Sequence, residues 1–265
     1  MNVRGYLGAV EMSIKSSLAY KSDYVLTLLF SFFEVLLLIF IWTAVYVGTK
    51  ASIIRGLTLP DIYFYFLVIY ALRTLMNMNL PFEMQESVAN GSIAVNYTRP
   101  LNFPLQLFFT GFGEDILSIL FIGVPIFLVV LVFSHAALST FSIAALVIEI
   151  LLAYAIVSVL GFLVGMLAFK FVYIWGIINI TWLIILLFGG GIMPLNFFPA
   201  TIRHVLLLLP FAIVLYVPAE TFLGNLSSSA ILFSIGISAA WLGALLAASA
   251  IVWGKARKLI ASARG

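Results

Sequence analysis

Six apolar stretches, most of them about 20 residues long, follow one another along this chain and limit its fold more than any other feature. They cover residues 24–47, 61–80, 114–133, 141–169, 171–188 and 230–253. A helix of about 20 residues crosses the hydrocarbon core of a bilayer. Hydrophobic residues make up 64% of the 265 residues and charged residues only 9%, too few to cover a soluble protein of this size. We therefore predict an all-α membrane protein with six transmembrane helices in a single domain, residues 1–265.

The positive charges predict the orientation of these helices. Six spans place nine Lys and Arg residues on one side and three on the other, with only Arg73 inside a span. Cytoplasmic loops carry the excess of positive charge, so we expect both termini in the cytoplasm. Lys170 alone separates the fourth and fifth stretches, and we place a break there because an unpaired ammonium group at mid-membrane is costly. The larger set is Arg4, Lys15, Lys21, Arg99, Lys170, Lys255, Arg257, Lys258 and Arg264; the smaller is Lys50, Arg55 and Arg203.

Two further segments do not fit a plain helix bundle. Residues 1–23 are predicted to form an amphipathic helix in the cytoplasmic interface, with Val3, Leu7, Val10, Ile14 and Leu18 on its apolar face. Residues 189–224 are apolar but interrupted by glycines and four prolines. We expect short, bent or re-entrant helices there, on the outer side.

The sequence lacks the residues that several kinds of catalysis and cofactor binding require. The chain has no cysteine, no glycine-rich phosphate loop with its lysine, and no GxSxG nucleophile motif. Its two histidines, His135 and His204, are far apart in the sequence. We therefore expect no catalytic residue, no metal site, no bound cofactor and no nucleic-acid partner. Energy for any work must come from another subunit or from an ion gradient.

Charged residues inside the spans are candidates for function. Glu34 in the first span and Arg73 in the second lie at similar depth, so they are predicted to form an ion pair. Such a pair either contributes to a gate or substrate path, or is a structural tie. Glu149 in the fourth span has no evident partner, and a proton-coupled carrier would need a group of this kind.

The fifth span carries a second candidate set, Tyr173, Trp175, Asn179 and Trp182. Aromatic faces and one amide could bind an amphipathic substrate. Packing against lipid or other helices explains the same residues, and the sequence leaves both interpretations open.

The order of these parts resembles the membrane subunit of ABC-2 type ATP-binding-cassette transporters. The stretch EMQESVANGSIAVNYTRP, residues 83–100, followed by Leu101 and Asn102, is similar to that family's E…(I/V)…GxI…RPLN segment. The run GGGIMPLNFFP, residues 189–199, resembles the glycine and proline break after the family's fifth span. The RPLN form is most like the subfamily called ABC2_membrane_6.

The resemblance implies the permease subunit of an exporter for an amphipathic or hydrophobic substrate, in the cell inner or plasma membrane. Two permeases, identical or sister chains, would pair, and a dimer of cytoplasmic ABC ATPases would bind ATP and magnesium. Residues 81–100 would be the ATPase-coupling segment, and residues 189–224 would hold an outer gate. Alternatives are a secondary carrier that uses Glu149 or the Glu34–Arg73 pair, and an accessory subunit that transports nothing. The coupling candidates are Glu83, Gln85, Glu86, Asn90, Gly91 and Arg99; the outer-gate candidates are Gly189, Gly190, Gly191, Pro194 and Pro199.

Overall fold

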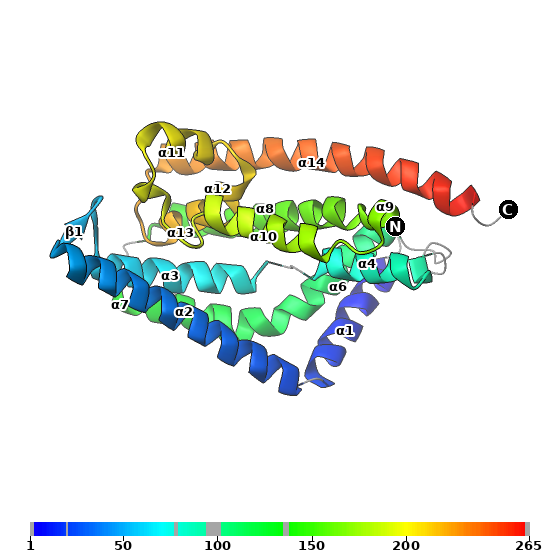
Figure 1. The fold of residues 1–265 in the computed structure, drawn as a ribbon, viewed down its shortest axis with the longest axis horizontal. Coiled ribbons are helices and arrows are strands. Elements are labelled where there is room, and N and C mark those ends of the chain that lie inside the picture. The colour runs from blue at the N-terminus through cyan, green and yellow to red at the C-terminus, as the bar shows by residue number, and fades with distance from the viewer. Residues whose placement is uncertain (1–2, 20, 77–78, 94–101, 135–137, 263–265) are drawn as a thin grey trace.

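The computed structural model describes residues 3–19, 21–76, 79–93, 102–134 and 138–262. These residues are almost entirely helical, and most of the long helices follow the longest axis of the molecule (Figure 1). One end carries a β-hairpin and the short helices that precede the last long helix, and we call it the hairpin end. Both chain termini lie toward the opposite end, which we call the terminal end (Figure 1).

Four described helices are long and apolar enough to cross a membrane, over Phe32–Thr49, Phe103–Phe133, Thr140–Phe171 and Ser228–Lys258. Two further apolar helices lie beside them but are shorter, with 16 and 14 residues. The all-α membrane class is thus confirmed, whereas the count of six spans stays a prediction. The long elements are α2 (Lys21–Thr49), α6 (Phe103–Ser118) continued by η1 (Ile119–Gly123) and α7 (Val124–Phe133), α8 (Thr140–Gly165) and α14 (Ser228–Ser262); the shorter ones are α3 (Leu59–Thr74) and α10 (Trp175–Phe188).

Three predicted boundaries were wrong: the end of the second apolar stretch, the start of the third, and the end of the sixth, where α14 continues to Ser262 instead of ending at residue 253. Helix α3 ends at Thr74 rather than at residue 80, and α4 (Leu80–Ala89) begins with Pro81 in its first turn. Proline lacks the N–H that would continue a preceding helix. Helix α6 begins at Phe103 instead of residue 114, because the Asn102 side chain caps it by accepting from the Leu105 N–H at 3.4 Å.

The break at Lys170 is confirmed. Helix α8 ends at Gly165, and Lys170 lies exposed in the short α9 (Ala168–Phe171). Val172 follows with a φ of 57° and a ψ of −56°, the centre of a γ-turn in which the Tyr173 N–H donates to the Phe171 carbonyl oxygen at 2.6 Å, and this turn stops the helix before α10 begins. The fourth and fifth apolar stretches are therefore separate helices that turn back on one another.

A short β-hairpin, which the hydrophobic pattern does not predict, connects α2 to α3. Strands β1 (Ile53–Ile54) and β2 (Leu57–Thr58) are antiparallel, with Ile54 opposite Leu57. The two turn residues, Arg55 and Gly56, both have positive φ, as a two-residue hairpin requires. Thr58 then forms a capping box with Asp61 at the start of α3.

Short broken helices occupy residues 189–224, as the glycines and prolines predict. They are η2 (Leu195–Phe197), α11 (Ala200–Leu207), α12 (Pro210–Val214) and α13 (Tyr216–Phe222). Helices α12 and α13 pack against α8, and α13 also contacts α3. Almost every residue of α12 and α13 is buried, so protein covers their interrupted backbone.

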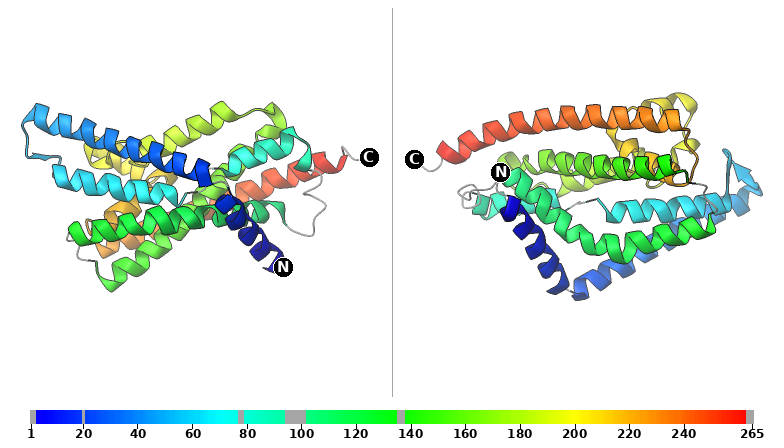
Figure 2. Two further views of the ribbon diagram at one scale, coloured as in Figure 1. Left: turned by 90° about the horizontal axis from the view of Figure 1, so that it is seen from below. Right: turned by 180° about the vertical axis from the view of Figure 1, so that it is seen from behind.

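The predicted N-terminal helix is α1 (Val3–Ala19), which crosses the terminal half of the bundle at a steep angle (Figure 2). Its contact with α6 buries Tyr6 and Ser13, and the Tyr6 hydroxyl accepts from the Asn102 N–H at 2.9 Å. Leu7 and Leu18, from the predicted apolar face, are exposed. Their exposure fits a helix lying in the membrane interface, which remains a prediction.

Gly113 sets how closely α1 approaches α6. A Cβ atom at this position would lie 2.7 Å from the Val10 carbonyl oxygen and 2.9 Å from Ser13 Cβ. We expect Gly113→Ala to lower stability by about 1–3 kcal/mol, because backbone must move to make room. The midpoint of thermal unfolding in mild detergent measures this. Gly243→Ala, where a Cβ meets nothing within 4 Å, is the control, and an equal effect of both changes would contradict this packing.

Candidate functional site

Helix α4 lies directly against the backbone of α8 near the terminal end. A Cβ atom on Gly165 would lie 2.7 Å from Met84 Cβ, and one on Gly161 would lie 3.2 Å from Pro81 Cδ. Glycines four residues apart on one helix allow a neighbouring helix to come this close. Met84 is fully buried in the contact. Helix α4 therefore cannot move independently of α8.

A second link joins α4 to the start of α10. Gln85 Oε1 accepts from the Ile174 N–H at 2.6 Å, and Ile174 is the residue immediately before α10. Helix α4 also contacts α9 and α6. Of the predicted coupling residues, Gln85 thus faces inward, where it connects the segment to a second apolar helix.

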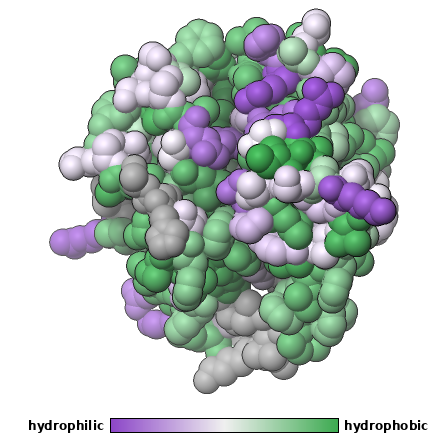
Figure 3. Space-filling view, turned by 90° about the vertical axis from the view of Figure 1, so that its left-hand side faces the viewer, coloured by the Kyte–Doolittle hydropathy of each residue, from purple (hydrophilic) through white to green (hydrophobic). Residues whose placement is uncertain are grey.

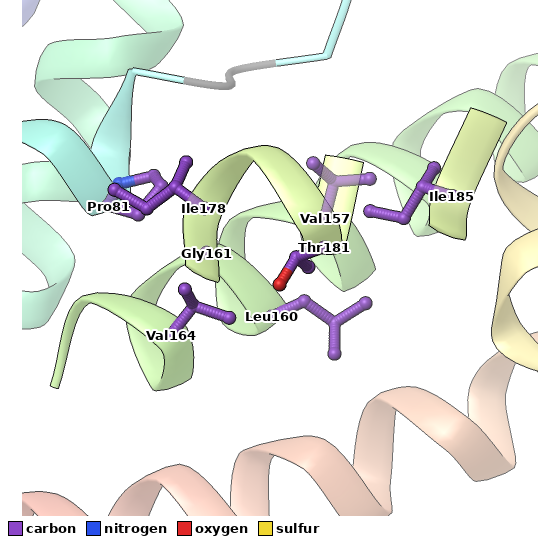
Figure 4. A pocket seen from close by; sticks show the side chains of 8 residues that line it. All are labelled: Pro81, Val157, Leu160, Gly161, Val164, Ile178, Thr181 and Ile185. Carbon is purple, nitrogen blue, oxygen red and sulfur yellow. The ribbon is translucent and has the colours of Figure 1, made fainter. Parts of the chain in front are cut away.

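A small apolar cavity lies where α4, α8 and α10 meet (Figure 4). Its volume is about 20 Å³. The only hydroxyl group in its lining, on Thr181, donates to the Ile177 carbonyl oxygen at 2.8 Å. A space this small and dry is a packing gap rather than a substrate pocket. The lining residues are Pro81, Val157, Leu160, Gly161, Val164, Ile178, Thr181 and Ile185.

The outward side of α4 presents three of the predicted coupling residues. Glu86, Asn90 and Gly91 are all exposed. Asn90 ends the helix, and its side chain accepts from the Ser92 N–H at 2.9 Å. Gly91 has a φ of 74°, which glycine adopts without strain. Arg99 lies outside the described residues.

Glu83, on the inward side of α4, joins a group of acidic residues. Its Oε1 atom is buried and has no hydrogen-bond partner among the described residues. Burial first, and then the neighbouring carboxylates of Glu114 and Asp115 on α6, raise the pKa of Glu83 from 4.5 to about 8. The side chain is therefore mostly neutral at pH 7.

The Glu34–Arg73 ion pair is present between α2 and α3. The Arg73 guanidinium carbon also lies 5.9 Å from the ring centre of Trp182 on α10, a cation–π contact. Three helices therefore meet at one charged cluster. Tyr173 and Trp175 do not join it and are largely exposed, while the Asn179 amide donates to the Trp175 carbonyl oxygen at 2.8 Å.

Glu149 lies apart from that cluster, between α8, α13 and α14. The side chain is only 1% exposed, and Ser234 Oγ donates to its Oε1 at 3.1 Å. Thr221 on α13 is adjacent to the same carboxyl group. The sequence did not indicate these partners, because Ser234 follows Glu149 by 85 positions.

The predicted outer-gate residues form a buried turn at the end of α10. Gly189, Gly190, Gly191 and Pro194 are buried, and Pro199 lies exposed before α11. Gly190 has a φ of 85°, and its carbonyl oxygen accepts from the Tyr65 hydroxyl at 2.8 Å. The turn is thereby held against α3.

A network that the sequence did not reveal holds the short helices together. Arg203 Nη2 on α11 donates to the Tyr216 hydroxyl at 2.9 Å, and that hydroxyl donates to Asn196 Oδ1 at 2.6 Å. The guanidinium group also lies over the Tyr216 ring. Tyr216 thus connects η2, α11 and α13.

Four long apolar helices with shorter ones packed among them are those of a multi-pass membrane protein. The family model described as ABC-2 family transporter protein matches residues 32–263. The chain therefore belongs to the ABC-2 transporter family, whose members are membrane permeases rather than enzymes. No curated protein matches the chain.

The buried Glu83 carboxyl predicts a pH-dependent stability. Because its pKa is higher in the folded protein than in the unfolded chain, the folded state keeps a proton that the unfolded state loses between about pH 4.5 and about pH 8. Stability should fall as the pH rises through this window. We expect Glu83→Gln, which stays neutral, to reduce the fall in unfolding temperature between about pH 6 and about pH 9. Parallel pH profiles for the two proteins would contradict this assignment.

Proposed function

We propose that the chain is the permease subunit of an ABC-2 exporter and that ATP hydrolysed on separate cytoplasmic ATPase subunits drives it. The observation that carries the proposal is the two-sided character of α4. Its outward residues Glu86, Asn90 and Gly91 are free to bind a partner, while its inward residues are fixed to α8 and α10. If the partner binds α4 differently before and after it hydrolyses ATP, the change in binding would therefore move two apolar helices, α8 and α10.

The proposed topology has six spans with both termini in the cytoplasm. Helices α3 and α10 would be the two short spans, since both lie among the four longer helices (Figure 1). The terminal end would face the cytoplasm, where α14 presents Lys255, Arg257 and Lys258. The hairpin end, which carries Lys50, Arg55 and Arg203, would be the outer side.

A second permease would complete the transport path. The Glu34 side chain is 44% exposed although it lies within a long apolar helix. Lipid solvates a carboxylate poorly, so charged groups at this depth face protein or a water-filled cavity. We propose that the face carrying Glu34, Arg73 and Trp182 lies toward the partner permease. Tyr173 and Trp175 would offer exposed aromatic surface to an amphipathic or hydrophobic substrate.

A proton-coupled secondary carrier is the second candidate, and the burial of Glu149 between three helices favours it. In that case transport would follow a proton gradient and would be lost in Glu149→Gln. For an ATP-driven permease, transport would follow ATP and ignore the gradient. An accessory subunit would respond to neither.

Binding of the ATPase through α4 can be tested with a charge reversal. The tagged chain, purified from its native membrane in mild detergent, should bring an ABC ATPase with it. We expect Glu86→Arg to weaken this association on the order of tenfold, or about 1.4 kcal/mol, without changing expression. Ser229→Arg, an exposed change at the other end of the molecule, is the control. Recovery of no ATPase, together with activity that ignores ATP, would rule out the proposal.

The absence of cysteine allows the proposed sidedness to be tested by single-cysteine labelling. Ser52 and Asn90 are both exposed and lie toward opposite ends of the molecule. A membrane-impermeant maleimide should label Ser52→Cys in intact cells, and Asn90→Cys only after the membrane is opened. The unlabelled natural chain gives the background. The reverse pattern would place α4 outside the cell and exclude any contact with a cytoplasmic ATPase.

A further inference from the structure

A second polar site lies at the hairpin end, away from α4. It is a cavity of about 60 Å³ between the hairpin, α3, the end of α7 and the turn after α13. Figure 3 looks at this end of the molecule and shows hydrophilic side chains gathered over its upper part, with apolar ones around them. The cavity can hold one or more water-sized particles. Its lining residues are Leu57, Asp61, Phe64, Tyr65, Ser134, Glu220, Leu223 and Asn225.

Glu220 is a buried carboxyl group in this cavity, and only one of its two oxygens has a hydrogen-bond partner among the described residues. Its side chain is only 3% exposed. Oε2 accepts from the Asn225 amide at 2.7 Å, whereas Oε1 is buried without a hydrogen-bond partner among the described residues. A buried carboxylate oxygen left in this state is unfavourable unless the group is protonated or something binds it.

Three further side chains with oxygen atoms able to bind a cation line the same cavity. Ser134 Oγ is likewise buried and lacks a partner among the described residues. The Asn225 side chain donates to Glu220 through its nitrogen, which leaves its amide oxygen available. Asp61 is held in place by Thr58, whose N–H and hydroxyl donate to Oδ2 at 2.8 Å and 2.7 Å.

No Lys or Arg side chain is among the residues that line this cavity. Arg203 acts on Glu220 electrostatically, but its Nη2 donates to the Tyr216 hydroxyl. In the part of the chain that the structure describes, the ion pairs are Lys15–Glu11 and Arg73–Glu34. The two carboxyl groups of Asp61 and Glu220 therefore lie at the cavity without an ion pair among the described residues.

We infer that this cavity binds a hard metal cation, for which Ca²⁺ is the best-matched probe, through Glu220, Asp61, Ser134 and Asn225. Calcium takes six to eight oxygen ligands in flexible geometry, and water would supply those that the protein does not. The described residues contain no group of three His, Cys, Asp or Glu able to hold a metal ion, so neutral oxygens must complete this set. The inference departs from our expectation of no metal site, which rested on the histidines and cysteines. It is independent of the proposed transport function.

Such a cation would connect elements far apart in sequence, because its ligands come from α3, from the residue after α7, and from α13 with the turn that follows it. Among the described residues, no ion pair links these elements. Bound cation should therefore stabilise the hairpin end and, with it, the folded protein.

Thermal unfolding of the purified full chain provides the test. After treatment with a chelator, the protein is heated with Ca²⁺, Mg²⁺ or Na⁺ at matched ionic strength. We expect Ca²⁺ to raise the unfolding temperature by several degrees at concentrations about 100-fold above its dissociation constant. Glu220→Gln should abolish this rise, whereas Asp115→Asn, which removes a buried carboxyl outside the cavity, should retain it.

A second readout does not depend on stability. Tb³⁺ replaces Ca²⁺ and emits when a nearby tyrosine is excited, and Tyr65 lines the cavity. Tyrosine-sensitised emission that Ca²⁺ displaces, and that is reduced in Ser134→Ala, would support the site even if Glu220→Gln fails to fold. No stabilisation by any of the three cations, or an equal rise in unfolding temperature in Glu220→Gln, would overturn the proposed cation site. Glu220 would then be a hydrated, protonated carboxyl group.

Discussion

The close contact between α4 and α8 is the constraint on which the terminal half of the molecule depends. Gly161 and Gly165 allow Pro81 and Met84 to approach the α8 backbone, and a side chain on either glycine would push α4 away. Leu80 and Met84 form a buried cluster with Phe103, Phe162 and Trp253, which belong to α6, α8 and α14. Separating α4 from α8 would therefore also disrupt the packing of two other long helices.

Hydrophobic length predicted the long helices well but their ends less well. Apolar length identifies segments that lipid can solvate, as for α8, which lies close to its predicted bounds, and for the start of α14. It does not identify the turns of a helix that lie outside its most apolar stretch, and for this reason the predicted third span begins at residue 114 whereas α6 begins at Phe103. The turn formed by Arg55 and Gly56 is a local signal of a kind that hydrophobic patterns ignore.

The candidate site was predictable where the contact depends on depth along neighbouring helices. Glu34 and Arg73 lie at similar depth in the predicted first and second spans, and this depth predicted their ion pair, although α3 ends at Thr74 and leaves Arg73 in its last turn. Glu149 with Ser234, Tyr216 with Arg203, and the cavity around Glu220 depend on how α13 and α14 fold back onto α8. The spacing of residues along the sequence does not indicate that α13 and α14 fold back onto α8. For the same reason, the inward direction of Gln85 became evident only in three dimensions.

The two ends of the molecule share one rigid element, α8. Its 26 residues extend about 39 Å, with the α4 contact at Gly161 and Gly165 near one end and Glu149 in the opposite half. Helices α12 and α13 pack on that same helix. A displacement of α4 can thus reach α12 and α13 through a single helix. The proposed coupling helix at one end and the proposed gate at the other would then need only two packing arrangements of α8 to be coupled.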